Sequence, residues 1–412
     1  MHHFKKISTL TGATLLFPIA LVLFEFAVYI ANDMVQPAML LVTQEFGVGN
    51  AWVPVSMTAF TLGGAMLTWL TGPWSDRAGR RPVMLAGASF FILTCLATYA
   101  AHQIESFLLL RILQGTGLCF IASVGYAVIQ EAYEEKTAVQ VTALMGNVGL
   151  LAPMIGPLAG AALISVAPWR SSFLIIAVIA LLALIGLWRT MPETVDPDSE
   201  KTPFSTIIHE YIALFSNGHF VISAVCIPIL CIPLVGWIAI SPVILVDDMH
   251  LSMLAYGLWQ LPVFGCIVLG NLFVAFVAKR WPLGRTVLIG VWPILLGVLI
   301  IIAGLVFDDN TPIYIVTGIS LISFALGLSY SVLYRFTLMS SELPKGIVSA
   351  GISLLALGLQ AAGIEVMRIA YVKWGMPGFS LATVLLTIGF VVLSRLRIHH
   401  EMALRADEMA TN

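Results

Sequence analysis

Two acidic residues inside one apolar stretch are the residues of this chain best placed to do chemistry. Glu25 and Asp33 lie within residues 23–36, LFEFAVYIANDMVQ, a segment that is otherwise apolar enough to cross a membrane. A charged side chain near the centre of a bilayer costs about 2.5–3.5 kcal/mol on insertion scales, so it normally faces protein or water and marks an ion or substrate path. We therefore expect this segment to line a polar cavity.

The spacing of its polar residues predicts which face does so. At about 100° per residue, Glu25, Tyr29, Asn32 and Gln36 fall on one narrow stripe of a helix. Asp33 lies about 80° from Glu25 and one to two turns further along the same helix.

A permanent cation stands inside a later apolar segment, Arg111-Ile-Leu-Gln-Gly-Thr-Gly117. Counted inward from the outer ends of their segments, Arg111 and Asp33 both lie roughly 8–11 Å deep, so the two side chains could share a level. Because an arginine does not usefully lose its proton, its expected role is to change the proton affinity of a nearby acid. The alternative is an arginine whose head group extends to the membrane interface.

The composition is that of an integral membrane protein. Of the 412 residues, 59% are hydrophobic and only 10% are charged, whereas a soluble domain carries about 25% charged residues. The net charge of −2 offers no basic face and argues against a nucleic-acid partner. The five cysteines lie in apolar runs without metal-ligand spacing, so we interpret them as buried thiols and expect no metal site.

Hydropathy divides the chain into twelve candidate transmembrane helices, and the fold class is therefore all-α. The polar interruption at 191–218 separates a bundle of six helices at 1–190 from a second bundle of six at 219–397, with a tail at 398–412. Lys and Arg gather in one set of connections, while the opposite set contains essentially only Arg170 and Lys373. Both termini are therefore expected in the cytoplasm.

A weak internal repeat supports the six-plus-six division. A shift of 205 residues carries the first span onto the seventh, and brings Gly79-Arg80 onto Gly284-Arg285. Parallel repeats of this kind occur in transporters whose binding site lies between the halves. The copies differ chemically, because Asp76 aligns with Trp281, and the acids of the first span align with the apolar Leu230 and Ile238.

The connection between the second and third spans, residues 72–81, is predicted to form a clasp at the inner face. Gly72 and Gly79 permit a tight reversal, and an acid in the loop can pair with a nearby arginine. A basic loop that only fixes topology would explain the arginines, but neither the acid nor the glycines. The proposed clasp residues are Asp76, Arg77, Arg80 and Arg81.

Residues 146–161 of the fifth span, GNVGLLAPMIGPLAGA, are rich in small residues and contain two prolines. Small residues let helices approach closely, while Pro153 and Pro157 remove backbone donors and bend the helix. Generic helix packing would give a similar enrichment.

These stretches resemble motifs of the major facilitator superfamily, in particular its twelve-span drug:proton antiporters. The 72–81 loop matches the signature G-x-L-a-D-r-x-G-r-r, with Trp74 in place of the usual leucine. Further matches are Arg111, Gln114, Gly115 and Gly117 to R-x-x-q-G-x-g, Gly156, Pro157 and Gly160 to the antiporter motif, where Ala161 replaces a second glycine, and the MPET sequence at 191–194.

The resemblance implies a major facilitator fold and proton-driven export of lipophilic cations, zwitterions and neutral compounds such as chloramphenicol from a bacterial inner membrane. It implies proton coupling through Asp33, Glu25 and Arg111, with the proton gradient as driving force and no cofactor. The protein is expected to work as a monomer in the lipid bilayer. The drug-binding residues implied by the resemblance are Glu25, Tyr29, Asn32, Asp33, Met57, Met145, Leu234 and Val235.

Two other functions stay open from the residues alone. One is a proton-coupled importer of a small nutrient, and the other is a membrane enzyme acting on lipid, although no phosphate-binding loop or catalytic triad is found.

Three weaker features have structural interpretations. The acidic cluster Glu131, Glu134 and Glu135 is favoured as a solvated helix end, with Arg335 as a conceivable partner. Glu365 and Arg368 are favoured as a self-neutralising helix pair. Residues 204–215 are amphipathic, which is typical of a helix on a membrane surface.

Overall fold

The computed structural model describes residues 7–8, 11–195, 203–277, 280–282, 284–307 and 312–411, and almost all of them are helical. Within these ranges, extended pairing is limited to one parallel bridge between Ile7 and Tyr133. The chain forms two compact units, Met1–Tyr211 and Ile212–Asn412. Residues 196–202 of the segment expected to link two bundles lie outside the described residues.

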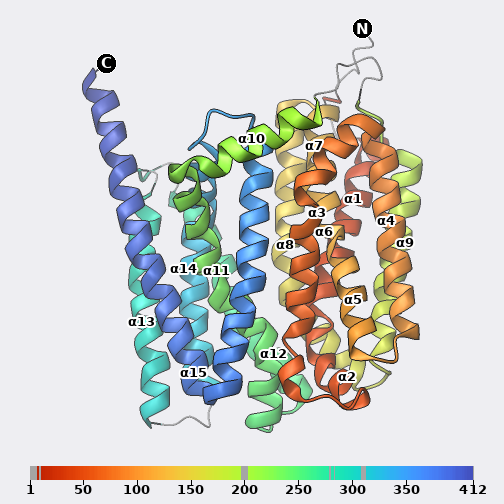
Figure 1. The fold of residues 1–412 in the computed structure, drawn as a ribbon, viewed down its shortest axis with the longest axis vertical. Coiled ribbons are helices and arrows are strands. Elements are labelled where there is room, and N and C mark those ends of the chain that lie inside the picture. The colour runs from red at the N-terminus through yellow and green to blue at the C-terminus, as the bar shows by residue number, and fades with distance from the viewer. Residues whose placement is uncertain are drawn as a thin grey trace. The chain divides into compact units, whose positions relative to one another are not determined.

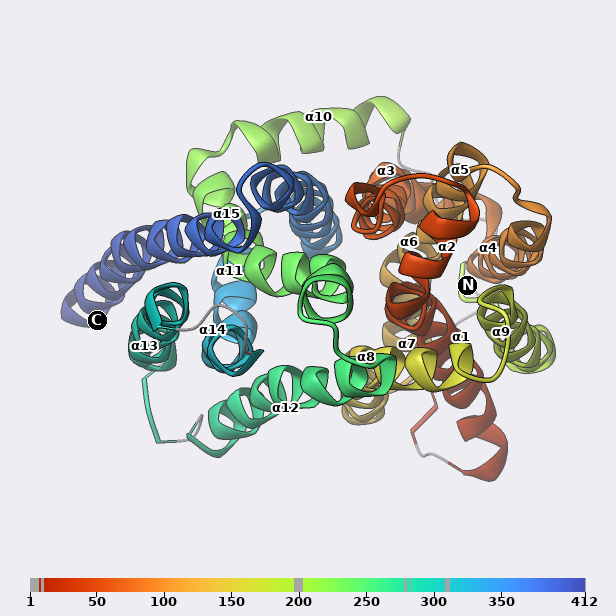
Figure 2. The same ribbon diagram turned by 90° about the horizontal axis from the view of Figure 1, so that it is seen from below.

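The first unit contains six segments long and apolar enough to cross a membrane, and its long helices run side by side (Figure 1). Helix α1 packs against both α8 and α9 (Figure 2). A 3₁₀ turn at Gln36–Ala38 and a π-helical turn at Ile121–Gly125 interrupt two of the spans. The helices are α1 (Gly12–Asp33), α2 (Met39–Glu45), α3 (Val55–Ala78), α4 (Arg80–Ala97), α5 (Ile104–Gly115), α6 (Gly117–Phe120), α7 (Tyr126–Ala132), α8 (Glu135–Ile164) and α9 (Arg170–Thr190).

The amphipathic segment at 204–215 forms helix α10 (Phe204–Ser216), in which the boundary between the two units falls. It buries Ile207, Tyr211 and Leu214 and exposes Ile208 and Ile212. This division into a buried and an exposed apolar side is what a helix at a membrane surface requires.

In its described residues, the second unit contains the end of α10 and five further helices, of which α11 packs against α14 and α15. They are α11 (Gly218–Pro242), continued by a π-helical turn at Val243–Asp248, then α12 (Met253–Val277), α13 (Arg285–Phe307), α14 (Pro312–Leu338) and α15 (Lys345–Thr411). Glu365 and Arg368 form an ion pair on α15, with 2.7 Å between Oε2 and Nε.

Helix α15 contains two membrane spans. Its apolar part, Lys345–Arg395, has 51 residues. A straight helix of that length would extend roughly 75 Å, more than twice the hydrocarbon thickness of about 30 Å. Gly375 interrupts it with φ 59° and ψ −146°, and the chain folds back on itself there (Figure 1). The eleven apolar segments of the described chain thus contain twelve spans, and the predicted all-α twelve-span fold is confirmed.

Close backbone contacts join the second and fourth spans within each unit. A Cβ atom added to Gly63 of α3 would lie 1.9 Å from the carbonyl oxygen of Ile112 in α5. In the second unit, a Cβ atom on Gly270 of α12 would lie 2.4 Å from the carbonyl oxygen of Phe324 in α14. Helices without a hydrophobic drive to associate rely on such small-residue contacts, and the two units solve this packing problem in the same way.

Candidate functional site

Pro37 explains where the first membrane helix stops. A proline has no N–H to give to the carbonyl four residues earlier, and its ring clashes with that carbonyl, which here belongs to Asp33. Helix α1 accordingly ends at Asp33, and the chain continues through the 3₁₀ turn into α2. A buried acid is therefore placed at the broken end of a helix within the first span.

Both acids of this span are buried, with exposed fractions of 1% for Glu25 and 3% for Asp33. Asn32 donates from Nδ2 to Oδ1 of Asp33 at 3.3 Å, and Gln36 donates from Nε2 to the carbonyl oxygen of Asn32 at 3.0 Å. Tyr29 and Asn32 are half-buried. Within the predicted stripe, the one side-chain hydrogen bond between members is therefore that of Gln36 to the backbone of Asn32, among the residues that the structure describes.

Helix α8 packs its glycines directly against the end of α1. A Cβ atom on Gly156 would lie 2.8 Å from Cβ of Asp33, and one on Gly160 would lie 2.1 Å from the carbonyl oxygen of Met34. Pro157 stands between these glycines inside the helix. The structure therefore brings the small residues of the fifth span against the acid at the end of the first.

Arg111 is fully buried and is tied to the same end of α1. Its Nη1 donates to the carbonyl oxygen of Ala31 at 3.0 Å and to Oε1 of Gln114 at 2.9 Å, while Nε donates to Oγ of Ser56 at 3.0 Å. This burial excludes a head group that extends to the membrane interface. The bond to Ala31 holds the guanidinium beside the residue two positions before Asp33. Among the described residues, no ion pair joins the side chains of Arg111 and Asp33.

The rest of the arginine's surroundings offsets the cost of burying a cation. Its guanidinium lies over the rings of Phe60 and Phe173, with 4.7 and 5.9 Å from Cζ to the ring centroids. Gln114 is itself held by Oγ1 of Thr98, which accepts from Nε2 at 2.8 Å. Nη2 of Arg111 is a buried donor with no hydrogen-bond partner among the described residues. Nη2 can therefore donate a hydrogen bond to a further group at this site.

Glu25 has a different neighbour, Tyr126 of α7, whose hydroxyl donates to Oε1 at 3.3 Å. The second oxygen, Oε2, is buried and has no hydrogen-bond partner within the described part of the chain. A carboxyl group with one satisfied and one unsatisfied oxygen is a ready acceptor for a ligand donor or cation. The sequence analysis did not single out Tyr126.

The remaining residues of the expected drug-binding set lie on several elements. Met57 of α3 and Met145 of α8 are buried in the first unit. Leu234, buried, and Val235, half-buried, lie on α11 in the second unit. Of the expected set, the side chains of Asn32 and Asp33 share a direct hydrogen bond, and no other pair of side chains does so among the described residues.

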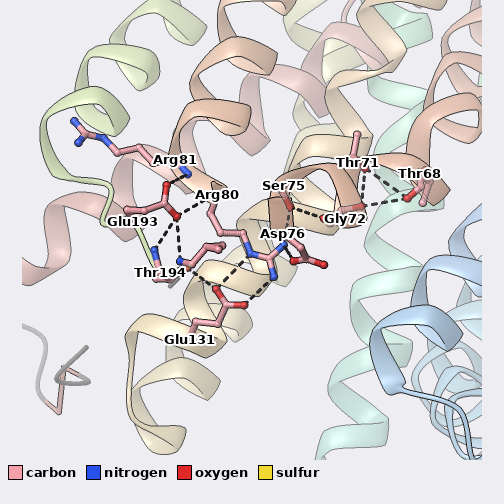
Figure 3. Close-up of polar contacts among 12 residues, drawn as sticks. Thr68, Thr71, Gly72, Ser75, Asp76, Arg80, Arg81, Glu131, Glu193 and Thr194 are labelled. Atoms are coloured by element: carbon pink, nitrogen blue, oxygen red, sulfur yellow. Dashed lines mark hydrogen bonds and ion pairs between the residues drawn. The ribbon is translucent and has the colours of Figure 1, made fainter. Parts of the chain in front are cut away.

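Residues 72–78 form the end of α3, so Gly79 alone separates α3 from α4 and the reversal expected at Gly72 is absent. Arg80, the first residue of α4, is held by a cluster of acids (Figure 3). Its Nη1 lies 2.6 Å from Oδ1 of Asp76, and its Nη2 lies 2.8 Å from Oε1 of Glu131. Nη1 also donates to Oγ of Ser75 at 2.6 Å. We call Asp76, Arg80, Glu131 and Glu193 the Arg80 cluster. Glu131 is therefore not a solvated helix end, whereas Glu134 and Glu135 are exposed.

Glu193, from the MPET sequence, caps α4 from 113 residues away. Its Oε1 and Oε2 accept from the backbone N–H groups of Arg80 at 2.9 Å and Arg81 at 3.1 Å (Figure 3). Carboxylates stabilise helix N-termini in this way because the first N–H groups have no partner inside the helix. The hydroxyl of Thr194 donates to Glu131, so residues 193 and 194 are bonded both to the start of α4 and to α7.

Gly79 is required by this arrangement on two counts. Its φ of +100° is a conformation that L side chains rarely adopt, and a Cβ atom there would lie 2.7 Å from Oε2 of Glu193. The other predicted clasp residues point elsewhere: Arg81 donates from Nη2 to the carbonyl oxygen of Trp188 at 2.6 Å, and Arg77 lies over the ring of Phe204. The MPET match at 191–194 pointed to Glu193 in the sequence but gave no partner for it.

Comparisons with known proteins agree with this architecture. The family model of the Major Facilitator Superfamily matches residues 21–365. Multidrug transporter MdfA of Yersinia pestis bv. Antiqua (strain Angola) is 44% identical over 393 residues, which cover 95% of this chain and 96% of that protein. Multidrug transporter MdfA of Escherichia coli O6:H1 is 45% identical over 367 residues, covering 89% of this chain and 90% of that protein.

Solved structures share the fold. A bacterial homolog to the human lysosomal transporter Spinster, in an inward-facing and occupied conformation, has a TM-score of 0.73 at 13% identity and covers 96% of this chain and 98% of its own. The human organic anion transporter MFSD10 (TETRAN) has a TM-score of 0.65 at 17% identity, with 93% and 98% covered. The family model and the 44% identical relatives show that this chain belongs to the Major Facilitator Superfamily and is a multi-pass membrane transporter, not an enzyme.

Proposed function

We propose that the chain exports lipophilic cations, zwitterions and neutral compounds such as chloramphenicol from the bacterial inner membrane in exchange for protons. The observation that carries this proposal is the pair of buried carboxyl groups on α1, neither of which has an ion-pair partner among the described residues. Relatives that are 44% identical are named multidrug transporters.

Asp33 is the proton-coupling acid in this proposal. It accepts a proton in the outward-facing state and releases it when a drug binds from the inside, because a cation or dipole in the pocket stabilises the carboxylate. Competition of drug and proton for one acid then links the two fluxes without a cofactor. The fixed cation of Arg111, with its unpaired Nη2, would hold the carboxylate once the proton has left.

Glu25 is the proposed determinant of drug choice, because its unpaired Oε2 is an acceptor for a cationic or hydrogen-bonding drug. Tyr29, Asn32, Met57 and Met145 are proposed to contact the drug in the first unit, and Leu234 and Val235 from α11. Methionine and aromatic side chains adapt to different shapes, which suits a site that accepts many compounds.

The Arg80 cluster is proposed as a conformational clasp on the cytoplasmic side. The distribution of Lys and Arg supports a cytoplasmic position for both termini, and a monomer is proposed as the working form. The glycines of α8 would transmit movement of the fifth span to Asp33, because they leave no space between the two backbones.

The test is drug-induced proton release from the purified protein in weakly buffered detergent solution, followed with a pH-sensitive dye. Tetraphenylphosphonium and chloramphenicol serve as a permanent cation and a neutral drug. A saturating concentration of either drug should release an amount of protons proportional to the amount of protein. The same drug added without protein is the control. Bound drug with no released proton would contradict exchange. In energised inverted vesicles, the drug should dissipate the proton gradient, which a nutrient importer would not show.

A further inference from the structure

The fourth span is interrupted by a π-helical turn at Ile121–Gly125, directly before Tyr126. A π turn holds one more residue than an α-helical turn, so it rotates every later side chain by about 100° relative to an unbroken helix. Tyr126 is the first residue after this turn, and its hydroxyl reaches Oε1 of Glu25 at 3.3 Å. The direction of this tyrosine is therefore a product of the π turn.

Neighbouring helices hold the π turn in place. Oγ of Ser123 accepts from Oγ1 of Thr71 at 2.9 Å and donates to the carbonyl oxygen of Thr68 at 3.4 Å, both on α3 (Figure 3 shows the two threonines). On its other side, a Cβ atom on Gly125 would lie 3.0 Å from Cδ1 of Leu21, one helical turn before Glu25. These contacts fix both the π turn and its distance from α1.

We propose that Tyr126 is a positioning residue for Glu25 and that it sets the preference of the site for cationic over neutral drugs. The inference rests on the proposed function of Glu25 in drug choice. The tyrosine hydroxyl satisfies Oε1 and stabilises the ionised carboxyl group, which leaves the unpartnered Oε2 to meet the drug cation. A neutral drug gains nothing from that charge.

The test compares Tyr126→Phe with the wild type by equilibrium binding of two probes, tetraphenylphosphonium and chloramphenicol, to the purified protein. The substitution removes one oxygen and keeps the ring. It should weaken tetraphenylphosphonium binding about three- to tenfold, the effect of losing one hydrogen bond of ordinary strength, and leave the chloramphenicol Kd within about twofold. Equal weakening of both probes, or no change in either, would overturn the proposal.

Tyr133→Phe is the matched control, because it removes a tyrosine hydroxyl just beyond the end of the same span. That hydroxyl donates to the carbonyl oxygen of Thr14 at 2.7 Å and has no role in the proposed site. Burial raises the pKa of Tyr133 to about 12, so its hydroxyl is a donor at neutral pH just as an ordinary tyrosine is. Tyr133→Phe should leave the ratio of the two Kd values unchanged.

A double-mutant cycle separates a specific contact from a packing effect. In Glu25→Gln the carboxylate charge is gone, so adding Tyr126→Phe should cause no further loss of tetraphenylphosphonium affinity. Additive losses would show that Tyr126 acts without Glu25 and would refute the inference. Ser123→Ala, which loosens the π turn, should shift the same ratio in the same direction by a smaller factor. These are binding measurements, so absent proton release in the wild type would overturn the export proposal alone.

Discussion

Two connections related by the 205-residue shift, one in each unit, have the same backbone turn and different chemistry. Gly79 and Gly284 both have φ of +100°, and each is followed at once by an arginine that begins a helix. Arg80 meets Asp76 and Glu131, whereas Arg285 lies over the ring of Trp281, with 4.9 Å from Cζ to the centroid. The turn serves the fold in both units, and among the residues that the structure describes only the first copy adds an acidic cluster to it.

The first and seventh spans also share a backbone position and differ in the chemistry of their side chains. Glu25 and Asp33 of α1 align with Leu230 and Ile238 of α11, and all four are buried. The shift also carries Gly160, which touches the main chain of α1, onto Glu365, which pairs with Arg368. At these aligned positions the two copies thus carry different groups on a repeated backbone, so substitutions there should have unequal effects.

The largest difference is expected at the fifth and eleventh spans. Gly160→Val should destabilise the protein by about 3 kcal/mol and abolish transport, because its Cβ atom would lie 2.1 Å from a backbone oxygen. Gly149→Val on the same helix, where nothing lies within 4 Å, is the matched control. Thermal unfolding and vesicle transport would measure both. Glu365→Gln should have a far smaller effect, and equal losses for Gly160 and Gly149 would contradict the packing argument.

Arginine substitutions compare the two turns directly. Arg80→Gln should lower the free energy of unfolding by about 2 kcal/mol, since it leaves two carboxylates side by side without their cation. Arg285→Gln removes only a stacked ring contact and should cost about 0.5–1 kcal/mol. Chemical denaturation of both variants in detergent is the measurement. A larger effect at Arg285 would reverse the comparison.

Alanine substitutions at Gly79 and Gly284 compare the two turns a second time. Gly79→Ala and Gly284→Ala both force an L side chain into φ of +100°, at a cost of about 1–2 kcal/mol. The first should cost about 1 kcal/mol more, because its Cβ atom would meet Glu193 at 2.7 Å. The double variant Gly79→Ala with Glu193→Ala should remove that excess, as read from melting temperatures.

Glu193→Gln should have a small effect, about 0.5–1 kcal/mol, because the amide oxygen still accepts one of the two N–H groups while the charge at the helix N-terminus is lost. Higher salt should reduce the difference from the wild type. A salt-independent loss would indicate that the carboxylate acts by shape alone.

The spans and the paired turns could be predicted from sequence because their signals are local. Hydropathy over about 20 residues defines a span, and Gly79-Arg80 recurs at Gly284-Arg285. Arg111 could be singled out as a candidate functional residue because a cation in an apolar helix is conspicuous by itself.

The Arg80 cluster and Tyr126 could not be predicted in the same way because their partners are distant in sequence. Glu193 reaches Arg80 across 113 residues, and Tyr126 reaches Glu25 across 101. Glu131 looked like a solvated helix end because it belongs to an acidic cluster with Glu134 and Glu135 in the sequence. The π turn depends on how Ser123 and Gly125 meet α3 and α1, which no local pattern encodes.

The central claim is that Asp33 exchanges a proton for drug. The most direct measurement is proton release from purified wild type, Asp33→Asn and Glu25→Gln on adding chloramphenicol, at drug concentrations that saturate each variant. Asparagine keeps the shape of the side chain and cannot release a proton. The account predicts no release from Asp33→Asn, with a melting temperature near that of the wild type, and retained release from Glu25→Gln. Normal release from folded, drug-saturated Asp33→Asn would contradict it.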